Sequence, residues 1–281
     1  MRYALVLAGG GVAGIAWELG VLRGLQDADP ALADRVLAAD LVVGTSAGSA
    51  VAAQITSGVP LGDLYDRQLS AESAEIEVEL NMEELLARFT AATADVNSSD
   101  EAMRAIGALA LETGTVDETV RKAAIAARLP VPDWPDRPVL LPAIDALTGE
   151  LVVFSRESGV ALVDAVAASC AVPGIWPPVT INGRRYIDGG IASATHADLA
   201  AGYDRTLVIS PALPDQPAPF DQLDGEIERL KPGRAHVIYP DAASVAAFGT
   251  NPLSPATRPP AAAAGRAIGQ EHAAEVAALW A

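Results

Sequence analysis

The chain has 281 residues, 51% of them hydrophobic and 20% charged, which suits one large α/β domain or two small ones and excludes an intrinsically disordered protein. Its net charge of −17 argues against nucleic-acid binding and against stable electrostatic adsorption to an anionic membrane. The single cysteine, Cys170, excludes an intrachain disulfide and favours a reducing compartment. We expect a cytoplasmic protein, and the apolar stretch at residues 3–16 leaves secretion open as an alternative.

Two strands and two helices are predicted at the start of the chain. Residues 3–8 form an apolar run bounded by glycines, which predicts a buried strand, and a helix is predicted over residues 14–29. A second apolar strand at residues 40–43 is followed by a helix at residues 49–54. The order strand, helix, strand, helix is typical of a parallel sheet with right-handed crossovers.

The remaining elements complete a three-layer α/β/α fold with a mainly parallel central sheet. Strand signals are missing from residues 61–130, where helical patterns predict an insertion packed over one end of the sheet. Beyond it, a helix is predicted at residues 162–169 and a hairpin around Asn182-Gly183. The other strands are predicted at 138–144, 150–154, 206–210 and 236–239. Proline-rich loops are predicted at 215–221 and 251–260, and a terminal helix at 261–280.

We expect residues 1–281 to form a single domain. Its core covers about residues 3–211, and the helical insertion covers about residues 61–130. A C-terminal extension follows at about residues 241–281. No internal repeat and no clear domain boundary interrupts the chain.

The pentapeptide Gly44-Thr45-Ser46-Ala47-Gly48 lies between the second predicted strand and the helix behind it. Strand, sharp turn, helix is the context of a nucleophile elbow, which exposes a serine at the carboxyl end of a strand. Glycines two residues before and after the serine avoid collisions with the neighbouring strand and helix. The start of the helix also supplies N–H groups and a positive dipole end beside the hydroxyl. Ser46 is therefore a candidate nucleophile.

A glycine loop, GGGVAG at residues 9–14, joins the first strand to the first helix. It matches the dinucleotide-binding pattern G-x-G-x-x-G, but that pattern requires an acid near the end of the second strand, where this chain has Gly44-Thr45-Ser46. The second interpretation is an oxyanion hole built from the N–H groups of Gly10 and Gly11. Consecutive parallel strands end side by side, so the loop should lie next to Ser46. The third interpretation is a tight turn with no ligand.

A serine nucleophile needs a base, and the chain offers two kinds. Its histidines, His196, His236 and His272, have no supporting acid in a local motif, but they leave open an α/β-hydrolase with a Ser-Asp-His triad. The competing base is Asp188, which ends the predicted hairpin and precedes two glycines. An Asp-Gly-Gly turn is also a common structural motif.

Three separated blocks, in this order, resemble the patatin-like phospholipase family: the glycine loop, the elbow around Ser46 and the turn Asp188-Gly189-Gly190. Residues 168–179 resemble the family's segment ahead of its catalytic aspartate, and the resemblance covers roughly residues 3–211. It implies a lipid acyl hydrolase with Ser46 as nucleophile and Asp188 as general base, without a metal or cofactor. It also implies a lipid ester as substrate, with transient contact to a membrane or micelle.

The resemblance also assigns the backbone of the site. The oxyanion-hole donors are expected from Gly9, Gly10, Gly11 and Ala47, and the motif glycines are Gly14, Gly44, Gly48, Gly189 and Gly190. The family loop usually carries Arg or Lys before its last glycine, where it can neutralise an oxyanion or a phosphate head group, but this chain has Ala13. That departure supports an alternative, a catalytically degenerate module that binds lipid or a partner.

Two further features have simpler interpretations. Six glutamates show no compact metal-ligand spacing and are expected to be solvated; they are Glu72, Glu75, Glu77, Glu79, Glu83 and Glu84. Cys170 lies at an apolar helix end, where buried packing is expected.

Overall fold

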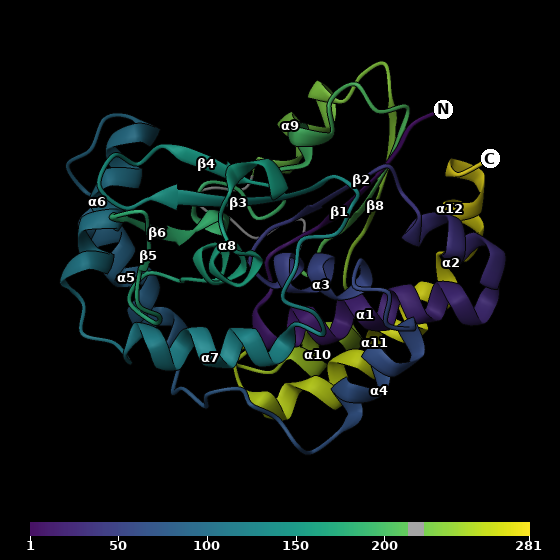
Figure 1. The fold of residues 1–281 in the computed structure, drawn as a ribbon, viewed down its shortest axis with the longest axis horizontal. Helices are drawn as coiled ribbons and strands as arrows, with labels where there is room; N and C mark the ends of the chain where they lie inside the picture. Colours follow the sequence, from purple (N-terminus) through teal and green to yellow (C-terminus); the bar gives the residue numbers. More distant parts are fainter. Residues whose placement is uncertain (213–221) are drawn as a thin grey trace.

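Eight strands form one mixed sheet in the computed structural model, which describes residues 1–212 and 222–281 (Figure 1). The strands are β1 (Tyr3–Leu7), β2 (Leu41–Gly44), β3 (Val139–Asp145), β4 (Leu151–Phe154), β5 (Val179–Ile181), β6 (Arg184–Asp188), β7 (Arg205–Ile209) and β8 (Arg234–Ile238). Their order is β5-β6-β3-β2-β1-β7-β8, with β4 paired with β3. The predicted loop at residues 215–221 lies outside the described residues.

Helices cover both faces of this sheet. The α-helices are α1 (Gly11–Ala28), α2 (Pro30–Leu37), α3 (Ala47–Ile55), α4 (Leu61–Leu69), α5 (Met82–Ala92), α6 (Ser99–Glu112), α7 (Glu118–Arg128), α8 (Leu162–Ser169), α9 (Leu223–Arg229), α10 (Ala242–Phe248), α11 (Arg258–Glu271) and α12 (Ala273–Leu279). Short 3-10 turns are η1 (Arg156–Ser158), η2 (Gly189–Ile191), η3 (Ala197–Ala200) and η4 (Pro255–Thr257). No helix among the described residues has both the length and the apolar character needed to span a bilayer.

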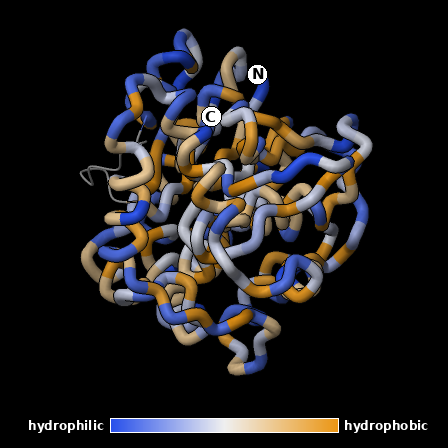
Figure 2. Tube along the Cα trace, turned by 90° about the vertical axis from the view of Figure 1, so that its left-hand side faces the viewer, coloured by the Kyte–Doolittle hydropathy of each residue, from blue (hydrophilic) through white to orange (hydrophobic). Residues whose placement is uncertain are grey.

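Alternate residues of the central strands enter different cores, which is why β1 and β2 are apolar throughout. Leu5 and Leu7 pack with α1, α3 and α11, whereas Ala4 and Val6 pack with η3 and α9 on the opposite face. Figure 1 shows α1, α10 and α11 below the sheet and α9 above it, and in Figure 2 the hydrophilic segments lie mostly at the outline of the molecule. The fold is the predicted three-layer α/β/α arrangement.

The register of the strands brings three segments that are distant in sequence to the same end of the sheet. The parallel strands β1 and β2 end together, because Leu7 pairs with Gly44. On the other side of β2, Val43 pairs with Leu140 of β3. Three residues further along β3, Ala143 pairs with Asp188 of the antiparallel strand β6. The end of β6 therefore lies just beyond the carboxyl end of β2.

The predicted hairpin and helical insertion are present. Asn182 (φ 51°) and Gly183 (φ 79°) form the tight turn between β5 and β6 with positive φ at both central residues, as expected for Asn-Gly. Helices α4 to α7 form the insertion, and α5 and α6 build a second core against Ile144 and Ile187. Helices α5 and α6 therefore pack on the antiparallel end of the sheet, as predicted for the insertion, whereas α4 packs on α1 and α11.

Three predicted boundaries were wrong. Helix α1 begins at Gly11 rather than at residue 14, so the second half of the glycine loop is its first turn. Residues 255–260 form η4 and the start of α11 instead of a loop, because prolines fit the first turn of a helix. The terminal helix is broken at His272 into α11 and α12.

Helix α11 packs backbone to backbone on α1 through glycines of both helices. A Cβ at Gly20 or Gly24 would overlap backbone of Ala262 or Arg266, and one at Gly265 or Gly269 would overlap carbonyl oxygens of α1. Only glycine permits this separation of the two axes. The C-terminal segment therefore covers the helix that carries the glycine loop.

We expect Gly269→Ala to destabilise the protein by about 1–3 kcal/mol, because its methyl group would displace the carbonyl of Val21. Urea denaturation measures the change. Gly225→Ala is the matched control in α9, where the nearest atom to the new Cβ is the flexible end of Arg229 at 3.6 Å, and it should be neutral or stabilising by about 1 kcal/mol. Equal effects of the two substitutions would contradict the close packing of α1 and α11.

Candidate active site

Ser46 occupies a sharp turn between β2 and α3. Its backbone has φ 51° and ψ −113°, a conformation that is strained for a residue with a side chain. A Cβ at Gly44 would overlap the carbonyl of Gly48, and a Cβ at Gly48 would overlap the carbonyl of Leu7 in β1. Both motif glycines are therefore required by close backbone approach, and the turn has the geometry of a nucleophile elbow.

Hydrogen bonds hold the backbone of Ser46 on both sides. Its N–H donates to the hydroxyl of Ser169 (2.9 Å), and its carbonyl accepts from Ser49 (2.6 Å) and from the thiol of Cys170 (3.1 Å). Cys170 is buried as predicted. The roles of Ser49 and Ser169 were not predicted, although Ser169 lies in the segment that resembles the family's sequence.

The hydroxyl of Ser46 donates to the carboxylate of Asp188, with 2.7 Å between Oγ and Oδ2. The second carboxylate oxygen accepts from the N–H of Gly190 at 2.7 Å, which fixes the orientation of the carboxylate. Both side chains are buried, with exposed fractions of 6% and 3%. At Gly189, a Cβ would overlap the carbonyl of Pro142, so the turn after Asp188 needs glycine to lie against β3.

Burial raises the pKa of Asp188 to about 7, because the protein interior disfavours the charged carboxylate. The hydrogen bonds from Ser46 and Gly190 and the positive charge of Arg121 favour the charged form and oppose this rise. At neutral pH, Asp188 is therefore close to the midpoint of its titration and is a much stronger base than an ordinary aspartate.

The glycine loop and the start of α3 line the same cavity as this pair, and some of their N–H groups have no acceptor. Among the described residues, the N–H groups of Gly10, Gly11 and Ala47 meet no acceptor. The N–H of Gly9 differs from the expectation, because it donates to the carbonyl of Ala194 at 2.9 Å and is not available to a ligand. Gly14 begins the hydrogen bonding of α1 by donating to Gly10 at 2.9 Å.

The three histidines are engaged away from Ser46. The Nε2 atom of His196 lies 3.0 Å from the carbonyl of Gly189. The Nε2 atom of His236 lies 3.3 Å from Nδ1 of His272, which pairs β8 with the junction of α11 and α12. The hydroxyl of Ser46 thus has an aspartate and no histidine as its partner.

His196, Asp198 and Glu226 have donor atoms within 4.8 Å of one another, but each is used by the fold. Glu226 accepts from Thr195 and from the N–H of Ala197 at 2.8 Å, and Asp198 pairs with Arg229 at 3.3 Å. The buried carboxylate of Glu226 thereby holds the loop whose Ala194 carbonyl anchors Gly9.

A cavity of about 290 Å³ opens over Ser46 and Asp188. The glycine loop lines one side of it, and the helical insertion contributes Leu80, Met82 and Leu85. Further apolar side chains come from the segment before β5 and from the C-terminal part; they are Val172, Ile175, Trp176 and Leu253. A mainly apolar chamber with a few polar groups at its base suits a small apolar chain.

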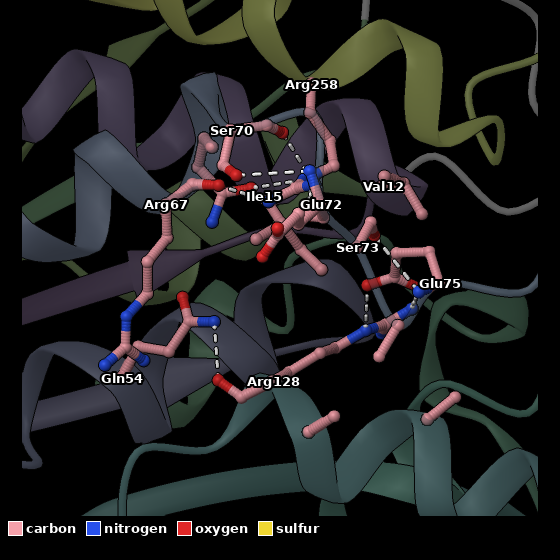
Figure 3. Close-up of a pocket in the computed structure, with 14 residues that line it drawn as sticks. Val12, Ile15, Gln54, Arg67, Ser70, Glu72, Ser73, Glu75, Arg128 and Arg258 are labelled. Atoms are coloured by element: carbon pink, nitrogen blue, oxygen red, sulfur yellow. Dashed lines mark hydrogen bonds and ion pairs between the residues drawn. The ribbon is translucent and has the colours of Figure 1, made fainter.

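Two arginines of α7, Arg121 and Arg128, also line this cavity, and neither was predicted from the sequence. Arg128 makes a bidentate ion pair with Glu75, at 2.6 and 2.7 Å, and both side chains are more than nine-tenths buried. Figure 3 shows this pair at the wall of a second cavity of about 270 Å³, which Arg128 also lines. The expectation that Glu75 is solvated was therefore wrong, because a buried cation is its partner.

The sequence model of the patatin-like phospholipase family matches residues 5–201. The chain belongs to this family. Family membership indicates a lipid acyl hydrolase at a general level. A comparison with curated proteins finds no match.

Two solved structures resemble the chain at low identity. VipD from Legionella pneumophila has a TM-score of 0.44 and 13% identity, over 96% of this chain and 67% of VipD. The type III effector protein ExoU has a TM-score of 0.42 and 14% identity, over 98% of this chain and 53% of ExoU. The chain thus spans about half the length of ExoU.

We expect Asp188→Asn to stabilise the fold at alkaline pH. Because the pKa of Asp188 is raised to about 7 in the folded state, its contribution to stability is fully present below about pH 4 and is lost as the pH rises through 7. A neutral amide avoids that loss, so the variant should be more stable than the parent by about 2–4 kcal/mol at about pH 8 and gain little near pH 4.

Urea denaturation at both pH values measures this difference. Asp133→Asn, at an exposed position, is the matched control and should change stability by less than about 0.5 kcal/mol at either pH. A loss of stability in Asp188→Asn at alkaline pH would contradict the desolvation of this carboxylate.

Proposed function

We propose that the protein is a serine acyl hydrolase that cleaves carboxylic esters of lipids through a dyad of Ser46 and Asp188. One observation carries this proposal. The Ser46 hydroxyl, in a strained elbow, donates at 2.7 Å to a buried carboxylate whose pKa burial raises to about 7. A nucleophile in hydrogen-bond contact with a base of matched pKa is the arrangement that acyl transfer requires.

In the proposed first step, the Oγ atom of Ser46 attacks the ester carbonyl while Asp188 takes its proton. Negative charge then develops on the former carbonyl oxygen, where the unengaged N–H groups of Gly10, Gly11 and Ala47 are available to stabilise it. One such donor contributes about 10²–10³ in rate. Collapse of the tetrahedral intermediate breaks the ester bond, and the proton on Asp188 passes to the leaving alkoxide.

In the second step, water hydrolyses the acyl-enzyme. Asp188 accepts a proton from the attacking water, and the resulting tetrahedral intermediate expels the Ser46 alkoxide, which recovers the proton. The same carboxylate thus serves as base and then acid in each half of the cycle. The apolar side chains of the cavity are suited to hold the acyl chain during both steps.

The other interpretations of the sequence have less support. A Ser-Asp-His triad would need a histidine at Ser46, and all three histidines have other partners. A degenerate lipid-binding module would have no reason to maintain a strained serine beside a desolvated carboxylate. Cytoplasmic location remains a proposal that rests on the single free thiol.

We expect a fluorophosphonate probe to label Ser46 stoichiometrically, because phosphonylation captures an activated serine in its nucleophilic state. Peptide mapping by mass spectrometry identifies the labelled residue. Ser46→Ala and Asp188→Asn should each lower the hydrolysis of a short-chain ester by at least about 10³-fold. Ser99→Ala, at an exposed serine of α6, is the matched control and should retain full labelling and activity. A folded protein that takes up no label would support the binding module.

We further expect kcat/KM for a neutral ester to rise with pH through about 7 and then to level off. Only ionised Asp188 accepts the proton of Ser46, and its pKa in the free enzyme is about 7. Initial rates between about pH 5 and pH 9 measure this profile. A profile that is flat across this range would rule out Asp188 as the base.

A further inference from the structure

The cavity over Ser46 is an apolar compartment of limited size. A methylene group occupies about as much space as a water molecule, roughly 30 Å³, so a cavity of about 290 Å³ holds a chain of about ten carbons. Each methylene that is buried against apolar side chains strengthens binding about two- to fourfold. The affinity of this site for an acyl chain should therefore rise with chain length only while the compartment has room.

Polar groups bound the compartment on the side of α7. Val12 and Arg128 line both the cavity over Ser46 and the second cavity of about 270 Å³, and they therefore lie between the two. Arg128 is held by its ion pair with Glu75, and the second cavity is lined mainly by polar side chains, among them Gln54 and Arg258 (Figure 3). An apolar chain that entered the second cavity would desolvate these groups without supplying hydrogen bonds, which is unfavourable.

Polar groups also bound the compartment on the side of α5. A hollow of about 550 Å³ adjoins it there, and Leu80, Leu85 and Ile175 line both spaces. Beyond these three residues, the hollow is lined mainly by polar side chains, among them the exposed carboxylates of Glu79 and Glu84. A chain that grew past the shared residues would lie against carboxylates or in water, and its added carbons would gain no apolar contact.

We propose that the preferred substrates are esters of medium-chain acids, with about ten carbons, and that Glu84 sets the outer limit of the compartment. The inference rests on the proposed function, since it names the acyl group that this site accepts. Shorter chains leave part of the compartment empty, and longer chains bury no further carbons in it. In a micelle or membrane, the surplus carbons of a longer chain are already buried among lipids, so moving them to the polar rim of this site would cost free energy.

Binding of ketones, which cannot be hydrolysed, tests this proposal without catalysis. The probes are linear methyl ketones of about four to fourteen carbons, titrated by calorimetry into the Ser46→Ala protein so that no covalent adduct forms. Their affinity should rise about two- to fourfold per methylene and level off at about ten carbons. An affinity that does not depend on length, or that rises at the same rate up to about fourteen carbons, would overturn the proposal.

Glu84→Leu extends the apolar surface of α5 into the hollow. It should move the level-off point up by about two carbons and strengthen a ketone of about fourteen carbons roughly 4- to 16-fold, while a ketone of about six carbons changes by less than about twofold. Glu83→Leu is the matched control, because Glu83 lies in the same turn of α5 and is exposed but lines neither space. Equal gains from both substitutions would indicate a general effect of surface hydrophobicity and overturn the role of Glu84.

Ile175→Trp is a second variant, which changes the compartment in the opposite direction. The larger side chain would take up space in the cavity over Ser46, so the level-off point should fall by about two carbons while ketones of about six carbons bind as before. An unchanged level-off point would show that the ketones bind elsewhere and would overturn the proposal.

Turnover shows which part of the ester occupies the compartment. With p-nitrophenyl esters of linear acids, kcat/KM of the parent protein should rise with acyl length and level off at about ten carbons. Acetate esters of linear alcohols should show no such rise. A rise with the length of the alcohol instead of the acid would place the leaving group in the compartment and overturn the proposal.

The two experiments together separate this inference from the proposed function. If the ketone series levels off as expected but no ester is cleaved, the dyad fails and the compartment stands. If esters are cleaved at rates that do not depend on acyl length, the proposed function stands and this inference fails.

Discussion

The strained turn at Ser46 is the constraint on which the rest of the structure depends. A serine at φ 51° costs about 1–3 kcal/mol and persists only where its surroundings hold it. Here α3 lies so close to β1 that Gly48 can carry no side chain, and Ser169, Ser49 and Cys170 bind the peptide groups on both sides. Because β1 and β2 are neighbours in the sheet, Leu7 of β1 lies beside Gly44, and β1 therefore contacts the turn at Ser46 directly.

The chemistry of the site has a cost in stability. Asp188 and Arg121 are both desolvated, and the two groups lack the complete pairing that buried charges normally have. Arg128, which lines the same cavity, has the pairing that is usual for a buried charge, a bidentate ion pair with Glu75. Incomplete pairing of buried charges is more typical of functional sites than of structural ones, which agrees with the proposed role of Asp188 as a base.

Local sequence patterns predicted most helices and strands of this fold, but they could not predict which distant residues contact one another. The elbow, the Asn-Gly hairpin and the helical insertion all follow from turn chemistry and periodicity. Ser169 lies 123 residues from Ser46, and Glu75 lies 53 residues from Arg128, so no spacing rule connects them. Arg121 was missed for a related reason, because an arginine on an amphipathic helix is usually solvated and only the packing of α7 buries it.

Helix α1, which begins at the glycine loop, packs through its glycines on α11, a helix that lies near the end of the given sequence. A polypeptide leaves the ribosome N-terminus first, so α1 is synthesised long before the helix α11 that packs on it. At the same helix contact, Arg266 of α11 forms an ion pair with Asp27 of α1, which lies 239 positions earlier in the chain. The glycine-bearing face of α1, the helix that starts at the glycine loop, is therefore covered only after α11 has been made. A chain that lacks α11 would expose this glycine-bearing face, which only the backbone of another helix can approach so closely.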